Sequence, residues 1–277
     1  MLTYTARRLS FVLLVVLFSS LVTFLLIFAS PGDPARMLAP IRPGDENRFP
    51  ELIAAIREKY ALDKPIHVQY LRYMSNVVQG DLGESFYYKR PVFDVLIARL
   101  PNTALLAAAI MVVGLVLGLP LGIVMAARSN SVLDKGLLTL GAVIVSLPGF
   151  LLALVLVYFV AFQWKLLPSS GSGSLRHLIL PALAGGLPTA IGYALILRTN
   201  MLTMFGEDYV RTARAKGLRS RRVILHHLLP NAVLPVVTIA SLDMATLLTG
   251  VVLLEQVFSW PGLGFITLKA VQAKDIP

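Results

Sequence analysis

Long apolar runs separated by polar segments dominate this sequence of 277 residues. Five runs cover about residues 9–29, 102–126, 133–162, 178–204 and 231–254. Each run can cross a bilayer as a helix, because a helix rises about 1.5 Å per residue and the hydrocarbon core is about 30 Å thick. The third run exceeds this need, so we expect it to tilt or project. The pattern predicts an all-α polytopic membrane protein.

The first run follows Arg7 and Arg8, as the apolar part of a secretory signal sequence does. It is longer than the apolar part of a cleaved signal, about 7–15 residues, and no small-x-small cleavage site is evident after it. We therefore expect a first membrane span that is retained in the mature protein.

Short basic segments predict the orientation, because Lys and Arg gather in the cytoplasmic loops of membrane proteins. The short loop after the third run has only Lys165 and Arg176. The other basic segments all fall on the opposite side: Arg7, Arg8, Arg128, Lys135 and the loop Glu207–Pro230. This side is predicted to be cytoplasmic, and it includes the N-terminus.

The polar segment 30–101 contains three amphipathic stretches. Pro50 and Pro65 can each begin a helix, and 91–100 reads as a third helix lying at the membrane interface. We expect a small helical extracytoplasmic domain, with a disordered loop as the alternative. The chain then divides into a first span at 1–29, this domain at 30–101 and a membrane core at 102–277.

Two stripes of small residues recur at every fourth position in the second and fourth runs. Such stripes let membrane helices approach closely, which predicts a packed bundle: Gly114, Gly118 and Gly122, and Ala182, Gly186, Ala190 and Ala194.

Prolines also lie inside the apolar runs. Pro120, Pro148 and Pro188 are expected to interrupt the second, third and fourth spans, as happens in transporters where neighbours or water satisfy the freed carbonyls. Pro148 is therefore a candidate residue of a translocation path.

Composition agrees with a membrane protein and argues against other classes. The chain is 56% hydrophobic and 14% charged, with a mean hydropathy of +0.75 and a net charge of +10. The charge is explained by the cytoplasmic loops, so we expect no nucleic acid partner. There is no cysteine, and the sequence has no ATP-binding, HExxH or GxSxG motif. We therefore predict no metal site and no catalytic residues.

The loop Glu207–Pro230 is the most ordered polar segment of the core. We expect two short helices hinged at Gly217, a residue suited to ending the first helix. Glu207 and Arg211 are spaced as a helical ion pair, Ser220 can cap the second helix, and Pro230 is expected to end it. The loop could dock on a partner protein or lie on anionic lipid.

Asp243 is the one acid expected deep within a span. A carboxylate in a bilayer should face a polar cavity or a partner, so Asp243 either lines a path or makes a hydrogen bond between helices. Glu255 and Arg198 lie at the ends of spans, where charges are easily solvated, and a structural role is expected for both.

The loop resembles the coupling loop of ABC importer permeases, whose pattern is EAA, three residues, Gly, nine residues and IxLP. Arg211-Thr212-Ala213 takes the EAA position, Gly217 the Gly and His227-Leu228-Leu229-Pro230 the IxLP. Arg211 and Thr212 depart from the general pattern, but DYVRTARAKGL at Asp208–Leu218 is similar to the dipeptide/oligopeptide/nickel branch. The resemblance covers essentially the whole chain and includes three further motifs: GDLGES at Gly80–Ser85, RLPNT at Arg99–Thr103 and EQVFSWPGLG at Glu255–Gly264.

The resemblance implies a type I permease fold with five spans present and a sixth missing after Pro277. It implies a non-catalytic permease subunit of the bacterial inner membrane that imports di- or oligopeptides together with a second, homologous permease subunit. Cytoplasmic ATPase subunits would hold ATP and Mg, with no cofactor on this chain, and an extracytoplasmic binding protein would deliver the cargo. The implied ATPase-coupling residues are Asp208, Tyr209, Arg211, Ala213, Arg214, Lys216, Gly217, Leu229 and Pro230.

Two alternatives remain open from the sequence. A permease of the same architecture could import a nickel chelate or glutathione. A secondary transporter working alone is the alternative from another class, and it would need a coupling charge inside the membrane, for which Asp243 is the only candidate. The residues proposed for the translocation path are Asp243 and Pro148.

Overall fold

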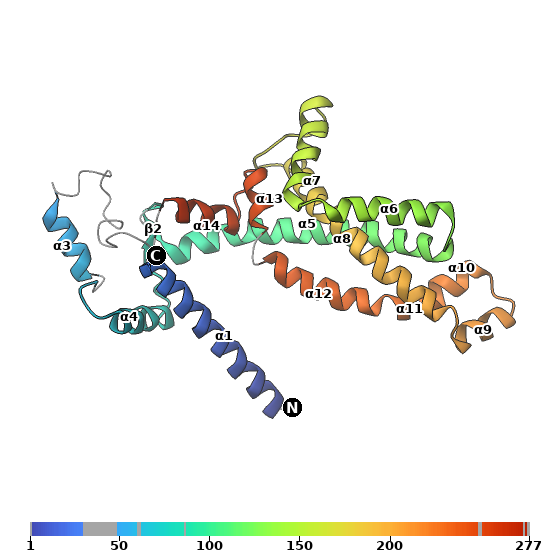
Figure 1. Cartoon of the computed structure of the whole chain (residues 1–277), viewed down its shortest axis with the longest axis horizontal. Helices are drawn as coiled ribbons and strands as arrows, with labels where there is room; N and C mark the ends of the chain where they lie inside the picture. Colours follow the sequence, from blue (N-terminus) through green and yellow to red (C-terminus); the bar gives the residue numbers. More distant parts are fainter. Residues whose placement is uncertain are drawn as a thin grey trace. The chain divides into compact units, whose positions relative to one another are not determined.

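The computed structural model describes residues 2–29, 49–59, 62–85, 87–248, 251–273 and 275. The described chain is almost entirely helical (Figure 1) and forms two compact units. The first unit comprises Met1–Ala98 with Lys269–Pro277, and the second comprises Arg99–Leu268. The predicted all-α fold class is thus confirmed.

Two predicted helices of the first unit are confirmed. Helix α3 covers Pro50–Lys59 and α4 covers Ile66–Val78, directly after Pro65. Gly80 follows α4 with a φ of 82°, a left-handed conformation that suits glycine at the end of a helix. A short antiparallel hairpin comes next, in which β1 (Glu84–Ser85) pairs with β2 (Arg90–Pro91).

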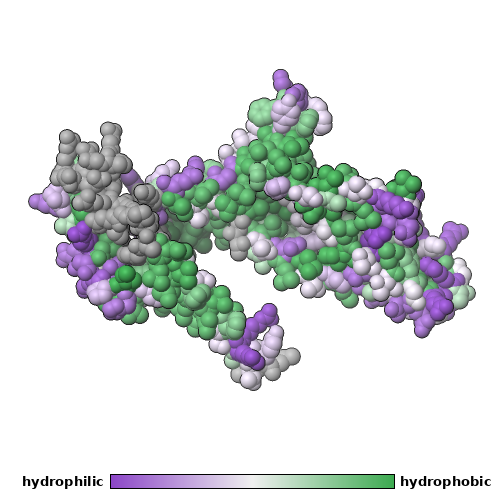
Figure 2. Space-filling model, in the orientation of Figure 1, coloured by the Kyte–Doolittle hydropathy of each residue, from purple (hydrophilic) through white to green (hydrophobic). Residues whose placement is uncertain are grey.

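Helix α1 (Leu2–Ala29) is a long apolar helix that contacts α4 within the first unit. The Phe24 ring lies 5.4 Å from that of Tyr70, and the hydroxyl oxygens of Ser20 and Tyr70 are 2.8 Å apart. Most of the α1 surface is exposed in this unit, and Figure 2 shows hydrophobic residues along its length. This surface is suited to lipid or to another membrane helix.

Helix α5 (Val92–Ala127) is one continuous helix. The separate interfacial helix predicted at 91–100 is therefore wrong, as is the interruption predicted at Pro120, because Pro101 and Pro120 both lie inside α5. Helix α8 (Leu175–Met204) likewise contains Pro188 without a break. A proline removes only one hydrogen bond of the helix, and the turns on either side keep theirs.

Pro148 does break the third apolar run. Helix α6 (Val132–Ser146) ends there. Helix α7 (Gly149–Leu156) runs on into the π-helix η2 (Val157–Gln163), and together they are bent by 103° from α6. Leu147 has extended backbone angles, as the residue before a proline prefers. The interruption predicted at Pro148 is therefore confirmed, and the run 133–162 consists of two helices that pass together as one broken span or one re-entrant loop.

The stripes of small residues lie where α5 meets α8, which confirms the close packing predicted for both helices. A Cβ atom added to Gly118 would lie 2.6 Å from the carbonyl oxygen of Ala190, and one added to Gly122 would lie 2.8 Å from that of Ala194. Only glycine permits these backbones to approach so closely. The two long helices therefore form the packed centre of the second unit.

The rest of the second unit consists of short helices and one longer helix. In chain order they are α9 (Asp208–Ala215), α10 (Ser220–Arg222), η3 (Val223–Leu228), α11 (Leu229–Ala232), α12 (Leu234–Leu248), α13 (Val252–Val257) and α14 (Leu263–Gln272). The helix Ser220–Ala232 bends by 47° before α12.

Among the described residues, three helices are long and apolar enough to cross a membrane: Thr3–Leu26, Val92–Ala127 and Leu175–Met204. The number rises to five if each of the two bent pairs is one span.

Candidate functional site

The first helix of the predicted coupling loop, α9, ends as the sequence predicts. Gly217 has a φ of 75°, and its N–H donates to the carbonyl of Arg214 at 2.9 Å. The N–H of Leu218 reaches back to the carbonyl of Ala213 at 3.4 Å. These two bonds form a Schellman motif, which requires a left-handed residue and fixes the direction of the following chain.

Charges at the two ends of α9 suit its dipole. Asp208 lies in the first turn and Arg214 in the last. The predicted pair of Glu207 and Arg211 is wrong, because Arg211 lies 3.7 Å from Asp208 instead. Glu207 is the N-cap with an extended backbone, so its side chain does not lie over the first helical turn.

The second helix of the loop differs from the prediction at both ends. Arg219 is the N-cap, so Ser220 is the first helical residue and makes no capping hydrogen bond. Pro230 lies near the start of α11 and does not end the helix, which continues to Ala232. The wider π-turns of η3 precede Pro230 and accommodate a residue that has no N–H to donate.

One face of this pair of helices is part of the core of the second unit. Its buried residues pack with Leu197 and Met201 of α8 and with Ala126 of α5, and they are Val210, Ala213, Val223 and Leu228. Because these residues are buried in one cluster, α9, η3 and the end of α8 are held together as one packed body.

The opposite face is exposed and basic. Asp208 and Arg211 have side chains that are 97% and 76% exposed. Figure 2 shows hydrophilic residues gathered over the end of the second unit that carries α9 and α10. We call this surface the basic face, and its residues are Asp208, Tyr209, Arg211, Arg214, Lys216, Gly217, Arg219, Arg221 and Arg222.

The predicted coupling residues therefore divide into a group that packs inside the unit and a group that is exposed. Ala213 is buried and Leu229 is half-buried, so these two support the loop from inside. Pro230 is exposed on the second helix. Arg214 is held in place by the Phe205 ring, whose centroid lies 5.4 Å from the guanidinium carbon.

Asp243 on α12 makes a hydrogen bond between helices. The Tyr193 hydroxyl on α8 donates to Asp243 Oδ2 at 2.9 Å and also lies 3.3 Å from Met111 Sδ on α5. The hydrogen-bonding alternative considered for Asp243 is thus present in this structure. Pro148 is exposed at the break between α6 and α7, and does not contribute to this cluster.

An ion pair that the sequence does not predict joins α6 to α8. Arg198 donates two hydrogen bonds to Asp134, from Nε to Oδ1 at 2.8 Å and from Nη2 to Oδ2 at 2.7 Å. The structural role predicted for Arg198 is confirmed. Its side chain, however, is not solvated as expected, because it pairs with the buried Asp134. The available signal was Ser131 followed three residues later by Asp134, a pattern typical of a helix start.

A second buried acid, Glu255, joins the RLPNT and EQVFSWPGLG segments. Glu255 is fully buried, which contradicts the easily solvated position expected for it. Its carboxylate accepts from the Thr103 hydroxyl and from the backbone N–H of Phe265, both at 2.8 Å. Thr103 in turn accepts from the N–H of Leu263 at 2.7 Å. Glu255 and Thr103 thus cap the first turn of α14.

The side chains of Asn102 and Trp260 extend this network. Asn102 Nδ2 donates to the carbonyl of Pro261, and Trp260 Nε1 donates to the carbonyl of Asn102, both at 2.9 Å. The RLPNT and EQVFSWPGLG motifs, which are distant in the sequence, therefore form one hydrogen-bonded cluster. The structural role expected for Glu255 is confirmed by this cluster.

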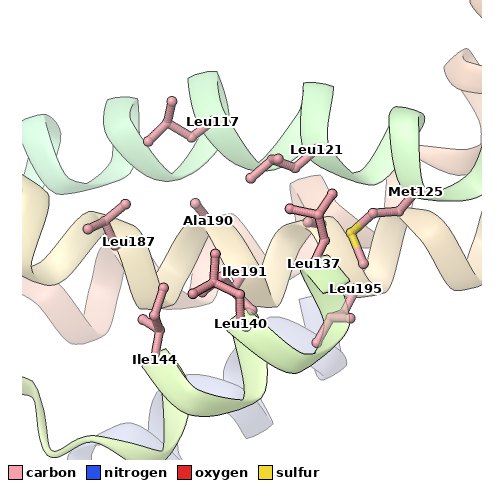
Figure 3. Close-up of a pocket in the computed structure, with 12 residues that line it drawn as sticks. Leu117, Leu121, Met125, Leu137, Leu140, Ile144, Leu187, Ala190, Ile191 and Leu195 are labelled. Atoms are coloured by element: carbon pink, nitrogen blue, oxygen red, sulfur yellow. The ribbon is translucent and has the colours of Figure 1, made fainter. Parts of the chain in front are cut away.

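An apolar cavity of about 180 Å³ lies between α5, α6 and α8. Figure 3 shows Leu117, Leu121 and Met125 from α5 facing Leu140 and Ile144 from α6, with α8 completing the wall. No polar side chain lines it. Within the described ranges, no three His, Asp or Glu side chains gather closely enough to hold a metal ion.

Comparison with known proteins shows which family this chain resembles along its length. The family described as binding-protein-dependent transport system inner membrane component matches residues 118–277. The N-terminal part of such a membrane component matches residues 1–107.

Several curated proteins are similar over the whole chain. The glutathione transport system permease protein GsiC of Salmonella paratyphi A is 37% identical over 277 residues, which cover 100% of this chain and 89% of that protein. The proteins of the same name from Escherichia coli and Salmonella typhi are 37% and 36% identical with the same coverage.

Proposed function

We propose that this chain, which belongs to the family of binding-protein-dependent transport system inner membrane components, forms half of the translocation path of an ATP-driven importer of short peptides. As a member of this family it is a multi-pass, non-catalytic subunit of the inner membrane. The second half of the path would come from a homologous permease, and cargo from an extracytoplasmic binding protein.

The observation that carries the proposal is the two-sided construction of α9–α11. One face is buried with the end of α8, and the other presents exposed charges to a partner. A helix that only lies on lipid offers its apolar face to the membrane, whereas the apolar face here is already buried. The exposed basic face therefore suits a cytoplasmic protein partner, for which we propose the ATPase subunits.

The mechanism follows from this rigid connection. ATP and Mg would be held by the ATPase subunits, with no cofactor on this chain. Closure of the ATPase dimer would carry α9–α11 along as a rigid body. Because Val210 and Val223 are buried with Met201, the end of α8 would move with them. The membrane helices would then alternate between inward-open and outward-open arrangements.

The cargo proposal rests on the similarity to the glutathione permeases. Glutathione is a tripeptide, so it lies within the class of short peptides that the loop motif indicates. We therefore propose glutathione or a peptide of similar size as the first cargo to test, with a nickel chelate as the alternative. Specificity would come largely from the binding protein, which is a different chain.

The hydrogen bond of Asp243 bears on the secondary-transporter alternative. Coupling to an ion gradient needs an acid that exchanges ions from within the membrane. Asp243 is instead hydrogen-bonded to Tyr193, which is itself buried. We therefore favour the importer, in which the work is done by ATPase subunits bound to the basic face.

The test is purification in mild detergent of the tagged full-length protein together with whatever binds to it. We expect a P-loop ATPase and a second permease to co-purify, and ATP hydrolysis to rise when binding protein and glutathione are added. Proteoliposomes of the complex should accumulate glutathione. A protein that purifies alone and still transports solute without ATP would contradict the proposal.

A further inference from the structure

Asp134 and Arg198 form an ion pair that fixes the position of two helices. The two hydrogen bonds run in parallel, at 2.8 and 2.7 Å, and the side chains are 1% and 17% exposed. A bidentate pair of this kind sets the orientation of its partners as well as their distance. The pair therefore determines where the start of α6 lies along α8.

The same carboxylate also organises the turn that leads into α6. Asn130, which has a φ of 62°, donates its backbone N–H to Asp134 Oδ2 at 2.8 Å. Ser131 accepts from the N–H of Asp134 at 3.2 Å and caps the helix. The Asp134 side chain thus connects the turn after α5, the first turn of α6 and the C-terminal part of α8.

Arg198 is close to the coupling loop in the sequence and in the core. Helix α8 ends at Met204, and α9 begins at Asp208. Leu197 and Met201, on either side of Arg198, are fully buried with residues of α9 and η3. A displacement of α9–α11 therefore moves the part of α8 that holds Arg198.

Helix α6 has few other specific contacts with α8. A Cβ atom added to Gly141 would lie 2.9 Å from Ile191 Cγ2, so the helices touch there. Elsewhere the apolar cavity of about 180 Å³ leaves space between them (Figure 3). Across the described residues, no other hydrogen bond or ion pair joins α6 to α8.

We propose that Asp134 and Arg198 are positioning residues that transmit movement of the coupling helices from α8 to α6. This inference rests on the proposed function. In each cycle the pair would hold α6 to α8, so that the break at Pro148 turns with them. The apolar contacts around the cavity are adaptable, whereas the two parallel hydrogen bonds are not.

A role in stability alone is a weaker explanation of the pair. A buried ion pair loses much of its Coulomb energy to desolvation, and a well-packed apolar pair is often as stable. Apolar side chains would not, however, reproduce the fixed orientation that the two parallel hydrogen bonds of the ion pair impose. The two roles predict different results, because a purely structural pair would affect assembly, and a positioning pair would affect the use of ATP.

The experiment measures cargo transported per ATP hydrolysed in proteoliposomes of the full complex. Arg198→Lys keeps both charges and loses the parallel hydrogen bonds. We expect it to assemble normally and to lower this ratio roughly tenfold, within the usual range of coupling between sites. Lys135→Gln removes an exposed charge beside the pair and serves as the matched control, with an unchanged ratio.

A second variant covers the case in which Arg198→Lys fails to assemble. Asp134→Asn combined with Arg198→Gln leaves a neutral pair that can still form a hydrogen bond, so no charge is buried alone. We expect the same fall in the ratio. A ratio within twofold of the unaltered complex in either assembled variant would overturn the inference, as would loss of assembly in both.

The unaltered complex separates this inference from the proposed function. If it does not couple ATP hydrolysis to uptake, the proposed function and the inference fail together. If it transports normally and the variants keep the same ratio, only the positioning role fails. If Arg198→Lys lowers uptake and ATP hydrolysis equally, the pair is structural and the inference is again wrong.

Discussion

Backbone conformation at Gly217 is the single-residue feature on which the coupling site most depends. Its φ of 75° places it in the left-handed region, and no atom of any residue beyond its two chain neighbours lies within 4 Å of the position where a Cβ would be. A substitution there is therefore limited by backbone strain and not by lack of space.

We predict that Gly217→Val uncouples transport from ATP hydrolysis while the protein still inserts into the membrane. A β-branched residue in the left-handed region costs about 1–2 kcal/mol or more, so the Schellman motif would open and α10 would change direction. The measurement is glutathione uptake per ATP hydrolysed in proteoliposomes.

Gly217→Asn is the matched control for this prediction, since asparagine tolerates the left-handed conformation. It should retain most of the coupling. Equal ratios in the valine and asparagine variants would mean that the conformation of Gly217 does not matter for transport.

Asp243 allows a second test at a single residue. Asp243→Asn keeps an acceptor for the Tyr193 hydroxyl and removes the charge. We predict that it reduces uptake about tenfold, equivalent to about 1.4 kcal/mol, while the amount of ATPase bound to the permease stays the same. The measurements are uptake by proteoliposomes and the subunit ratio of the purified complex.

Tyr193→Phe is the control, because it removes the hydrogen bond and leaves the carboxylate in place. A path-lining charge predicts a stronger effect for Asp243→Asn than for Tyr193→Phe. Unchanged uptake in the Asp243 variant would leave only the contact between α8 and α12.

The hydrogen-bond partners of the two buried acids, Asp134 and Glu255, could not be predicted from the sequence. Thr103 and Glu255 are 152 positions apart, and Asp134 and Arg198 are 64 apart. Each residue by itself is compatible with a solvated end of a span, and only the fold brings the partners together. By contrast, Gly217 was predicted correctly because a left-handed glycine after a helix is a local requirement.

At the scale of elements, the helices with local signals were predicted, whereas the interruptions expected at prolines were confirmed only at Pro148. Pro50, Pro65 and Gly80 mark ends that the structure confirms. Pro120 and Pro148 have the same local chemistry, yet only Pro148 breaks its helix. Pro120 follows Gly118, where α5 packs tightly on α8, so tertiary contacts keep that helix continuous.

We predict that Gly118→Ala destabilises the bundle by about 1–3 kcal/mol, the usual cost of overpacking. The new methyl group would lie 2.6 Å from the backbone oxygen of Ala190, and a backbone atom cannot move aside as a side chain can. The measurement is the temperature at which the detergent-purified protein loses its monodisperse peak in size-exclusion chromatography.

Gly192→Ala on α8 is the matched control, because nothing lies within 4 Å of its added Cβ. Alanine favours a helix over glycine by about 1 kcal/mol, so this variant should be as stable as the original or more so. Equal losses in both variants would show that close packing is not what Gly118 provides.

At the scale of the whole molecule, the side on which each loop lies depends on the bent pair α6–α7. If this pair crosses the membrane, the turn after α5 and the basic face lie on one side, as their positive charge favours. If it enters and leaves on the same face, only α8 separates them, and they lie on opposite sides. The 103° angle is compatible with a broken span and with a re-entrant loop.

We predict that α6 and α7 together make one crossing, so that the N-terminus, the turn at Arg128 and the basic face are all cytoplasmic. The chain has no cysteine, so each single cysteine introduced by substitution is the one thiol of this chain that a maleimide can label. In spheroplasts, a membrane-impermeant maleimide should label Asp63→Cys and Ser170→Cys, whereas Tyr4→Cys and Arg128→Cys should react only after permeabilisation. Labelling of Ser170→Cys only after permeabilisation would identify α6–α7 as a re-entrant loop. The basic face would then lie outside, where no ATPase could reach it.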